Sequence, residues 1–346
     1  MSSRALVAPG AAAVTALVLL VSVAVALGLG AVSIPVSDVV AVVARRLNLG
    51  TYDVSPLDDQ IVWQLRLPRV LGAAAVGAGL SVCGAVLQSL TRNDLADPYL
   101  LGISSGAAVG AVTVIVLGTS AVGVLGVASV TGAGLLGALG ALAVVLLLAA
   151  GPRGELSPAR TVLAGVLVAQ ACGAYVAALI LMSGDSDAAR RVLTWTLGSV
   201  AGLRWDSALL LVVVAVLGTV AFTALAGQLD AFAFGDVSAR SLGVHVDRLR
   251  WLLMVGTALV TASLVAYAGT IGFVGLVVPH LVRAVTGALH RALLPLSALV
   301  GAVLLVWADT LARTVVDGQE IPVGVVTAMV GTPFFAWLLR RRREAR

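Results

Sequence analysis

Hydrophobic and polar positions occur along this chain in long blocks, with extended apolar runs separated by short polar segments. A helix that crosses the hydrocarbon core of a bilayer needs about 20 mostly apolar residues. Runs of this kind predict about ten crossings, and only Gly269, Thr270 and Gly272 separate the seventh from the eighth. The predicted crossings are residues 11–33, 67–90, 100–118, 121–150, 161–182, 207–227, 251–268, 271–286, 292–312 and 321–339. We therefore expect an all-α polytopic membrane protein in which residues 1–346 form a single transmembrane domain.

The arginines predict how the helices are oriented in the membrane. The last apolar run is followed by Arg340-Arg341-Arg342-Arg343, and arginine clusters in short flanking segments stay in the cytoplasm. Ten crossings then place the N-terminus in the cytoplasm as well. The other arginines on that side are Arg92, Arg153, Arg160, Arg240, Arg248, Arg250 and Arg291. We expect a cytoplasmic-membrane protein with both termini inside.

A second set of arginines falls on the outer side in this arrangement. These residues are Arg45, Arg46, Arg66, Arg69, Arg190, Arg191, Arg204 and Arg313. They form either a mixed, solvated surface together with nearby aspartates or a docking face for an acidic partner. Residues 33–48, between the first two crossings, have valines at helical spacing and predict an amphipathic helix lying on the outer membrane surface.

The composition excludes several classes of function. The chain is 60% hydrophobic and 11% charged, with a mean hydropathy of +1.07, whereas a soluble protein is roughly half apolar and a quarter charged. All 22 basic residues are arginine. A Walker A phosphate-binding loop requires a lysine, so any ATP must be hydrolysed by another polypeptide. The basic pI follows from the arginine excess and does not indicate nucleic acid binding, and we expect no nucleic acid partner.

Residues that could support catalysis or bind a metal form no recognisable pattern. His245, His280 and His290 lie apart without ligand spacing, and no nucleophile motif or paired carboxylates are present. We expect no enzyme activity, no metal site and no cofactor bound by this chain. Proton-coupled carriers place acidic residues deep in the bilayer, whereas Asp97 and Asp309 lie near the ends of crossings. This pattern argues against a proton-coupled secondary transporter. No sequence feature favours a passive channel, and both remain as alternatives.

Three polar or helix-breaking segments interrupt the apolar pattern, at residues 92–102, 235–243 and 272–283. The second lies in the longest predicted inner loop, residues 229–250, and residues 236–242 are long enough for about two helical turns. A membrane protein that receives force from a soluble motor needs a short rigid projection of this kind. We predict a cytoplasmic coupling loop here, and a solvated loop helix without a partner is the alternative. Gly102, Gly106 and Gly110 repeat every four residues and predict close helix packing.

Taken together, these segments resemble the FecCD-type permeases of iron-siderophore, haem and cobalamin ABC importers. The resemblance extends from about residue 61 to residue 339, and Asp94 departs from it where the family commonly has proline. The motifs are Leu67-Pro68-Arg69; residues 84–88 with Arg92-Asn93; Ala96-Asp97-Pro98 with Leu101-Gly102-Ile103-Ser104-Ser105-Gly106; Ala239 with Leu242-Gly243; Gly272-Phe273-Val274-Gly275-Leu276 with Pro279-His280 and Arg283; Ala308-Asp309 with Arg313; and Pro322-Val323-Gly324 with Gly331-Thr332-Pro333-Phe334.

The resemblance implies an architecture and a set of partners. It implies a permease of the large, type II, cobalamin-permease-like architecture that pairs with a second permease subunit, as a homodimer or a paralogous heterodimer. Two cytoplasmic ABC ATPase subunits would bind ATP and magnesium, and an extracytoplasmic solute-binding protein would deliver the substrate. The expected substrate is an iron chelate, a ferric siderophore first, with haem or cobalamin as the alternative.

The resemblance also assigns roles to individual residues. It places the ATPase-coupling loop at Asp236, Ala239, Arg240, Leu242 and Gly243, and the docking contacts with the binding protein at Arg66, Arg69 and Arg313. Ser157, Pro158 and Ala159 fall in the inner turn that forms a gate in relatives. Because the fifth and tenth helices line the path in relatives, Gln170, Thr327 and Met329 are expected along its wall.

Overall fold

The computed structural model describes residues 4–117, 124–152, 154–316 and 318–344. Within these ranges the regular secondary structure is helical, apart from an isolated antiparallel bridge between Ala150 and Leu156, and turns and loops connect the helices. The helices are α1 (Arg4–Gly28), α2 (Val36–Arg46), α3 (Pro56–Gln60), the π-helix η1 (Ile61–Arg66), α4 (Leu67–Thr91), the 3₁₀-helix η2 (Pro98–Leu101), α5 (Ile103–Leu117), α6 (Val124–Ala149), α7 (Pro158–Ser183), α8 (Ser186–Thr196), α9 (Trp205–Ala224), α10 (Ala226–Phe232), α11 (Asp236–Ser241), α12 (Val246–Ala268), α13 (Val274–Thr286), α14 (His290–Ala312) and α15 (Val323–Glu344). The all-α class predicted from the sequence is confirmed.

The predicted crossings correspond to long apolar helices among the described residues. Seven are long and apolar enough to span a bilayer, in α1, α4, α6, α7, α9, α12 and α14. Shorter apolar helices occupy α5, α13 and α15, where the other three crossings are expected. Helix ends differ from the predicted ones by a few residues. The predicted boundary between residues 118 and 121, and Arg153, lie outside the described residues.

Three features differ from or sharpen the sequence-based expectation. The second crossing begins early, because α3 and η1 continue into α4 and form one helical segment, Pro56–Thr91. The sequence does not predict α8, whose Ala188 and Val192 are buried while its other face is polar. Gly269 ends α12 with a φ of 67°, so the expected break between the seventh and eighth crossings is present.

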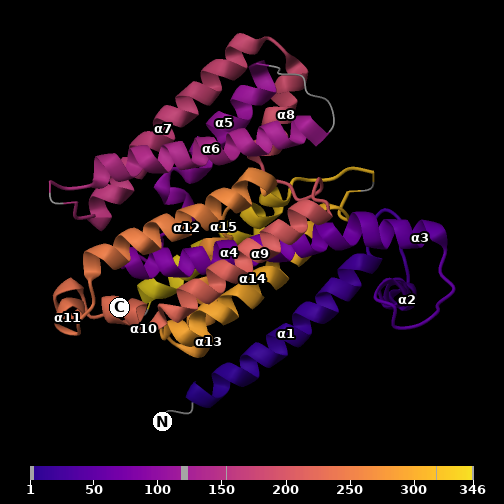
Figure 1. The fold of residues 1–346 in the computed structure, drawn as a ribbon, viewed down its shortest axis with the longest axis horizontal. Helices are drawn as coiled ribbons and strands as arrows, with labels where there is room; N and C mark the ends of the chain where they lie inside the picture. Colours follow the sequence, from indigo (N-terminus) through magenta and orange to yellow (C-terminus); the bar gives the residue numbers. More distant parts are fainter. Residues whose placement is uncertain (1–3, 118–123, 153, 317, 345–346) are drawn as a thin grey trace.

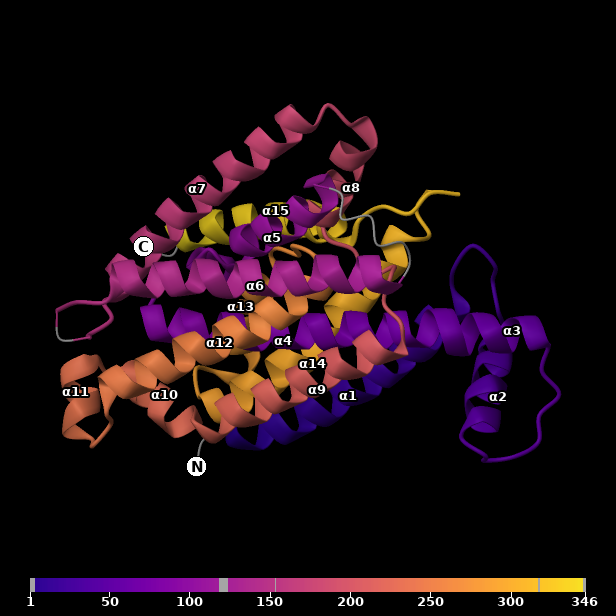
Figure 2. The same ribbon diagram turned by 45° about the horizontal axis from the view of Figure 1, so that its top comes forward.

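The helices form two groups (Figures 1 and 2). In the larger group, α9, α12, α13 and α14 pack around α4, and α1 packs along α14. Glycine and alanine are frequent in α4, and such small residues allow neighbouring backbones to approach closely. The second group, α5, α6 and α7, lies against the first through contacts of α5 and α6 with α12.

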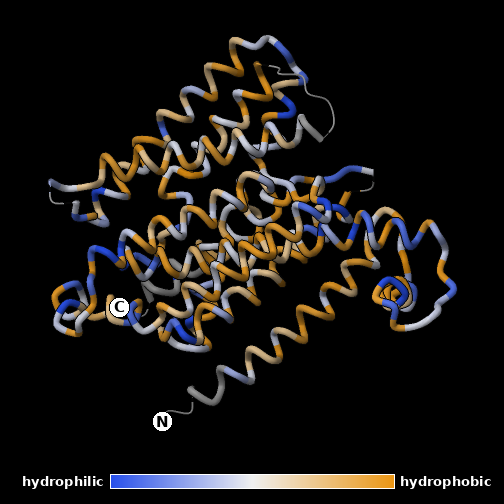
Figure 3. Tube along the Cα trace, viewed as in Figure 1, coloured by the Kyte–Doolittle hydropathy of each residue, from blue (hydrophilic) through white to orange (hydrophobic). Residues whose placement is uncertain are grey.

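Apolar residues cover much of the length of the helices, and polar residues concentrate near their ends (Figure 3). Large apolar side chains point outward from several helices: Leu20, Leu147, Leu181 and Leu217 are all well exposed, Leu181 by 84%. In a bilayer these side chains face lipid tails, while the backbone polar groups are satisfied within each helix. The exterior is therefore suited to a hydrocarbon solvent, and lipid is the expected surrounding partner.

The polar sites lie at the two ends of the bundle. We call the end that carries α10 and α11 the α11 end, and the opposite end, with α2 and α3, the α3 end (Figure 1). The described chain begins with α1 and finishes with α15 at the α11 end in both views, as an even number of crossings requires. The segment predicted to be amphipathic forms α2 at the α3 end, with Val39 and Val42 buried.

Candidate functional site

A short helical projection, α10 and α11, stands at the α11 end of the bundle (Figure 1). The chain turns into α11 at Gly235 with a φ of 89° and leaves it at Gly243 with a φ of 84°, conformations that glycine adopts without a Cβ clash. Ala239 is completely buried, whereas Val237 is 84% and Leu242 67% exposed. The predicted coupling loop is therefore an ordered projection with an apolar tip.

The carboxylate of Asp236 holds this projection to the bundle. It accepts a hydrogen bond from Arg250, with Nη2 3.0 Å from Oδ2, and its Oδ1 lies 3.4 Å from Nη2 of Arg92. Arg240 instead pairs with Asp247, at 3.1 Å between Nη2 and Oδ2. Of the residues expected in the coupling loop, Asp236 and Ala239 fix the projection, while Arg240, Leu242 and Gly243 lie on its surface.

A buried hydrogen-bond chain ties the base of the projection to two central helices. Asp230 of α10 accepts from the backbone N–H of His290 at 3.0 Å, and its Oδ1 lies 2.6 Å from His290 Nδ1. The other ring nitrogen of His290 contacts the hydroxyl of Ser89 on α4. No local pattern in the sequence marks His290 as part of this chain of hydrogen bonds, because its partners are 60 and 201 residues away.

The predicted gate residues lie where α7 begins. Ser157 precedes the helix and Pro158 occupies its first position, where proline's missing N–H leaves no intrahelical bond unmade. Ala159 is exposed. The carbonyl of Ser157 accepts a hydrogen bond from the hydroxyl of Thr161 at 2.9 Å. The three residues thus form the first turn of α7 and its approach.

The structure separates the three residues expected along the path wall. Gln170 on α7 and Met329 on α15 are exposed, Met329 by 72%. Thr327 is buried, and its hydroxyl donates to the carbonyl of Gly324 within its own helix at 3.1 Å. Thr327 also lines an apolar cavity of about 340 Å³ between α13, α14 and α15. Gln170 and Met329 therefore lie on the outer surface of the subunit, whereas Thr327 packs in its interior.

Two of the helix-breaking segments meet through Tyr99. Its hydroxyl donates to the carbonyl of Ile271 at 2.9 Å and accepts from the Ile271 backbone N–H at 2.8 Å. Asp97 caps the 3₁₀-helix η2 by accepting from the Tyr99 backbone N–H at 2.9 Å. Burial raises the pKa of Asp97 to about 6, and the hydrogen bond from the Tyr99 backbone opposes that rise. The turn after α4 is thereby fixed to the break between α12 and α13.

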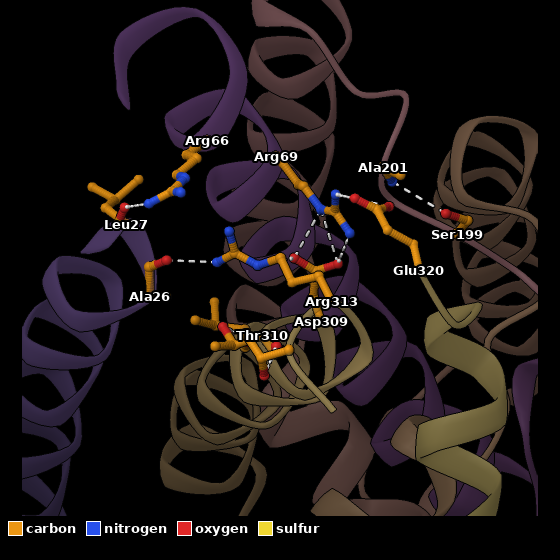
Figure 4. A network of polar contacts seen from close by, with 12 residues as sticks. Ala26, Leu27, Arg66, Arg69, Ser199, Ala201, Asp309, Thr310, Arg313 and Glu320 are labelled. Atoms are coloured by element: carbon orange, nitrogen blue, oxygen red, sulfur yellow. Dashed lines mark hydrogen bonds and ion pairs between the residues drawn. The ribbon is translucent and has the colours of Figure 1, made fainter. Parts of the chain in front are cut away.

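A buried arginine network occupies the α3 end (Figure 4). Arg69 donates to Asp309 through Nε, 3.0 Å from Oδ2, and through Nη2, 2.9 Å from Oδ1. Its remaining Nη1 donates to Glu320 Oε1 at 2.9 Å. Arg69 and Asp309 are at least nine-tenths buried, whereas the Glu320 side chain is 54% exposed. Arg69 therefore links α4, α14 and the segment that precedes α15.

Arg66 and Arg313 hold the end of α1 against the same network. Arg66 donates to the carbonyl of Leu27 at 2.7 Å and to that of Gly28 at 3.1 Å, and Arg313 donates to the carbonyl of Ala26. Burial lowers the pKa of the Arg313 guanidinium, and Asp309 partly offsets that effect. The Nε of Arg313 is buried and has no hydrogen-bond acceptor among the described residues.

The three arginines predicted to dock a partner thus have intramolecular roles. The resemblance predicts them on the outer face, and the structure buries most of each side chain at the α3 end. They nevertheless line a cavity of about 650 Å³ at this end, together with exposed Arg204 and Glu320. Glu320 belongs to none of the motifs recognised in the sequence, whereas Asp309 stands near a helix end and in the motif Ala308-Asp309 with Arg313.

The predicted packing glycines have two different surroundings. A Cβ at Gly110 would lie 1.8 Å from the carbonyl oxygen of Ala133, and one at Gly106 would lie 2.4 Å from that of Gly137. Both glycines therefore permit contact between the backbones of α5 and α6. Gly102 has a φ of 69° and follows η2, so it forms the turn that introduces α5.

The described residues contain no group of three His, Cys, Asp or Glu side chains that could hold a metal ion. The polar groups at both ends instead hold helices together or face the outside. The arrangement is suited to mechanical linkage at the α11 end and to ionic recognition at the α3 end.

Comparison with known proteins gives consistent matches over nearly the whole chain. Residues 18–341 match the sequence model of the FecCD transport family. The chain is 44% identical over 282 residues to the cobalamin import system permease protein BtuC of Halobacterium salinarum, across 82% of this chain and 74% of that protein. It is 43% identical over 290 residues to the hemin transport system permease protein HmuU of Yersinia pestis, across 82% of this chain and 85% of that protein.

The fold is similar to a solved inward-facing structure of an ABC transporter that is described as belonging, by assignment, to the metal-chelate type. The TM-score is 0.83 and the sequence identity 31%, and the match covers 96% of this chain and 99% of that one.

Proposed function

This chain belongs to the FecCD transport family and is the permease subunit of an ABC transporter, and from that premise we propose that it imports a bulky metal chelate. The chain is not itself an enzyme. Its fold is the type II, BtuC-like permease fold with about ten helices, as its motifs predict. The expectation of a membrane protein driven by a separate ATPase agrees with a sequence that lacks the lysine of a Walker A loop.

The observation that carries the proposal is the projection of α10 and α11. It presents exposed apolar side chains, Phe234, Val237 and Leu242, at an end of the bundle where the neighbouring residues are polar. An exposed apolar cluster with a polar rim is typical of a protein interaction site. Its occupant in this proposal is a cytoplasmic ABC ATPase subunit, whose movement on ATP binding is passed to the helices.

The proposed orientation places the α11 end in the cytoplasm. Arg340 and the arginines that follow it lie at the end of α15, and Arg240 and Arg248 are exposed close to α11. Flanking arginines are retained on the cytoplasmic side. The α3 end then faces outward, toward the solute-binding protein.

The cavity at the α3 end is the proposed docking point for that binding protein. It is lined by Arg66, Arg69 and Arg313, and by Arg204, which is exposed. Carboxylates of a partner would pair with these arginines and fix the docking register, because arginine–carboxylate pairs are directional. The internal contacts of the arginines position them for this role.

The translocation path is proposed to lie between two permease subunits. In α7 only 11% of the most apolar window is buried, against 83% in the segment that contains α4, so much of the surface of α7 is not covered by its own subunit. Gln170 and Met329 lie on exposed faces. A second copy or a paralogous subunit would cover these faces and enclose a path.

Alternating access then requires that the ATPase bind the two conformations of the permease with different affinity. A motor with equal affinity for both would shift nothing. ATP binding would favour one arrangement of the helices, and hydrolysis would release it. The sequence offered Asp97 and Asp309 as the acids that a proton-coupled carrier could use. In the described part of the chain Asp309 is paired with Arg69 and Asp97 caps η2, so neither supports that alternative.

The substrate class is proposed from the relatives. The named relatives carry cobalamin or hemin, both of which hold a metal in a tetrapyrrole ring, and we favour a metal–tetrapyrrole. A ferric siderophore stays the prediction from the sequence and is tested beside it.

The experiment is uptake by vesicles that contain the assembled importer and its binding protein. Labelled cobalamin, haem and a ferric siderophore are offered separately, with and without internal ATP. We expect ATP-dependent uptake of one tetrapyrrole. Uptake of the siderophore alone would contradict the tetrapyrrole assignment, and ATP-dependent uptake of none of the three would contradict chelate import.

A further inference from the structure

Arg250 joins the coupling projection to the inner turn that leads into α7. Its guanidinium is buried, with the side chain 4% exposed. Nη2 donates to Asp236 at the start of α11, 3.0 Å from Oδ2. Nη1 donates to the carbonyl of Leu156 at 2.9 Å. One planar side chain therefore bonds two segments that are about 80 residues apart in the sequence.

The segment that Arg250 holds is itself well ordered by its hydrogen bonds. Ala150 and Leu156 form an antiparallel bridge, and the Gly151 backbone N–H donates to the carbonyl of Glu155 at 2.9 Å. The neighbouring Trp251 donates from Nε1 to the carbonyl of Gly154 at 2.8 Å. Arg250 and Trp251, two successive residues of α12, thus both donate hydrogen bonds to this turn. Because the turn is closed by its own hydrogen bonds, a displacement of Leu156 also displaces the rest of the turn.

This turn leads directly into α7, the long apolar helix whose surface is least covered within the described part of the subunit. α7 begins at Pro158, two residues after Leu156, and its apolar window is 11% buried, the smallest share among the seven long apolar spans in the described residues. α7 packs on α5 and α6 and has little contact with α4, around which α9, α12, α13 and α14 are packed. The bond from Arg250 is therefore placed at the end of a helix that is free to move with the second group against the group around α4.

We propose that Arg250 is the positioning residue that transmits movement of the α11 projection to the inner turn and α7. The inference deepens the proposed function and rests on it, since it requires an ATPase on α11 and a gate at residues 156–159. When α11 moves, Asp236 moves with it, and Arg250 passes that displacement to the Leu156 carbonyl.

The chemistry of the site favours arginine over lysine. The guanidinium is a rigid fork that donates in two directions at once, while a lysine ammonium is a point charge on a flexible stem. Phe232 supports the fork, with its ring centroid 5.6 Å from Cζ of Arg250. Arg92 also pairs with Asp236, but it is 51% exposed and bonds neither residue of the inner turn that α12 holds.

The test uses the complete importer in vesicles and compares uptake per ATP hydrolysed. Arg250→Gln is expected to lower uptake per ATP about tenfold, within the usual range of coupling between two sites, because the link to Leu156 is lost while the ATPase still docks on Val237 and Leu242. Arg250→Lys is expected to fall between this variant and the unmodified protein, since it keeps the ion pair alone. Arg248→Gln is the matched control on the same helix, because Arg248 is exposed.

A second readout separates transmission from a merely structural role. Amide hydrogen exchange of residues 150–157 is measured with and without a non-hydrolysable ATP analogue. In the unmodified complex the analogue is expected to change exchange in this turn, and in Arg250→Gln the change is expected to disappear although the analogue still binds. If Arg250→Gln does not fold, Trp251→Phe removes only the bond to Gly154 and is expected to lower uptake per ATP about threefold.

The outcomes separate this inference from the proposed function. Unchanged uptake per ATP in Arg250→Gln, or in both Arg250→Lys and Trp251→Phe, overturns the inference alone. An equal loss in Arg248→Gln does the same. If the unmodified complex shows no ATP-driven uptake, or if Leu242→Arg leaves uptake unchanged, the coupling role of α11 fails and the inference fails with it.

Discussion

At the α3 end, Arg69 has one permanent partner and one exchangeable partner. Asp309 accepts from two of its nitrogens and is 1% exposed, whereas the Glu320 side chain is 54% exposed. Removing one member of a buried pair costs about 3–5 kcal/mol, while an exposed pair contributes only about 0–1 kcal/mol. Glu320 is therefore the carboxylate that an incoming acidic partner can displace.

Glu320→Gln is expected to tighten docking of the binding protein. The neutral amide competes less well for Nη1 of Arg69, and the cavity loses a negative charge that repels an acidic partner. Because the pair is half exposed and screened, the expected gain in affinity is only about threefold. Fluorescence titration of labelled binding protein against the assembled importer at physiological salt measures it.

Asp53→Asn provides the control, since Asp53 is an exposed acid that does not line the cavity. Its affinity should match that of the unmodified importer. Docking that is weaker or unchanged in Glu320→Gln would mean that Arg69 serves the stability of the subunit and takes no part in recognition.

At this scale the sequence predicts which residues matter better than what they touch. Arg69, Arg313 and Asp309 stand in recognisable motifs, but the partners of Arg69 are 240 and 251 residues away, and no local pattern encodes such a pair. The hydrogen bond from Arg250 to Leu156 is equally hard to predict from the sequence, because its acceptor is a backbone carbonyl and any residue type could supply it. Such contacts depend on tertiary packing and cannot be inferred from spacing.

Among the elements, α5 and α6 show how small residues set the distance between helices. Gly110 faces the carbonyl of Ala133 and Gly106 faces that of Gly137. Both neighbours are backbone atoms, which cannot rotate away as a side chain can. The glycines therefore determine how closely the second helix group closes.

Gly110→Ala is expected to destabilise the subunit by about 2 kcal/mol, the cost typical of overpacking in a core. The added Cβ would lie 1.8 Å from the Ala133 carbonyl oxygen, so α5 and α6 would have to separate. The midpoint of thermal unfolding in detergent should fall measurably.

Gly140→Ala on α6 is the matched control, because nothing lies within 4 Å of a Cβ there. Its midpoint should stay the same or rise, since alanine favours a helix over glycine by about 1 kcal/mol. Equal loss in both variants would contradict the assignment of Gly110 to close packing.

Length and hydropathy predict the long helices well, because lipid imposes one requirement on every crossing. They fail for α8, an amphipathic helix of 11 residues with one buried face and one polar face. Such a helix lacks the continuous apolar run that marks a crossing. They also miss the joining of α3 and η1 to α4, since the polar residues of Pro56–Gln60 resemble a loop. Short amphipathic elements need knowledge of their neighbours.

For the whole molecule, the structure separates a firmly packed group around α4 from a second group whose α7 is largely uncovered. The group around α4 has polar contacts at both of its ends, with Asp236 and Arg250 at one end and Arg69 and Asp309 at the other. Such an arrangement allows one group to move against the other while the ends are held by partners. The arrangement is suited to a transporter that binds partner proteins on both sides of the membrane.

Uphill accumulation of the chelate in sealed vesicles tests this account most directly. The permease pair is reconstituted with its binding protein, either alone or together with its ATPase subunits, and internal and external chelate concentrations are compared. The account predicts accumulation above the external concentration only when the ATPase subunits and ATP are both present. Accumulation by the permease pair without the ATPase subunits would contradict it.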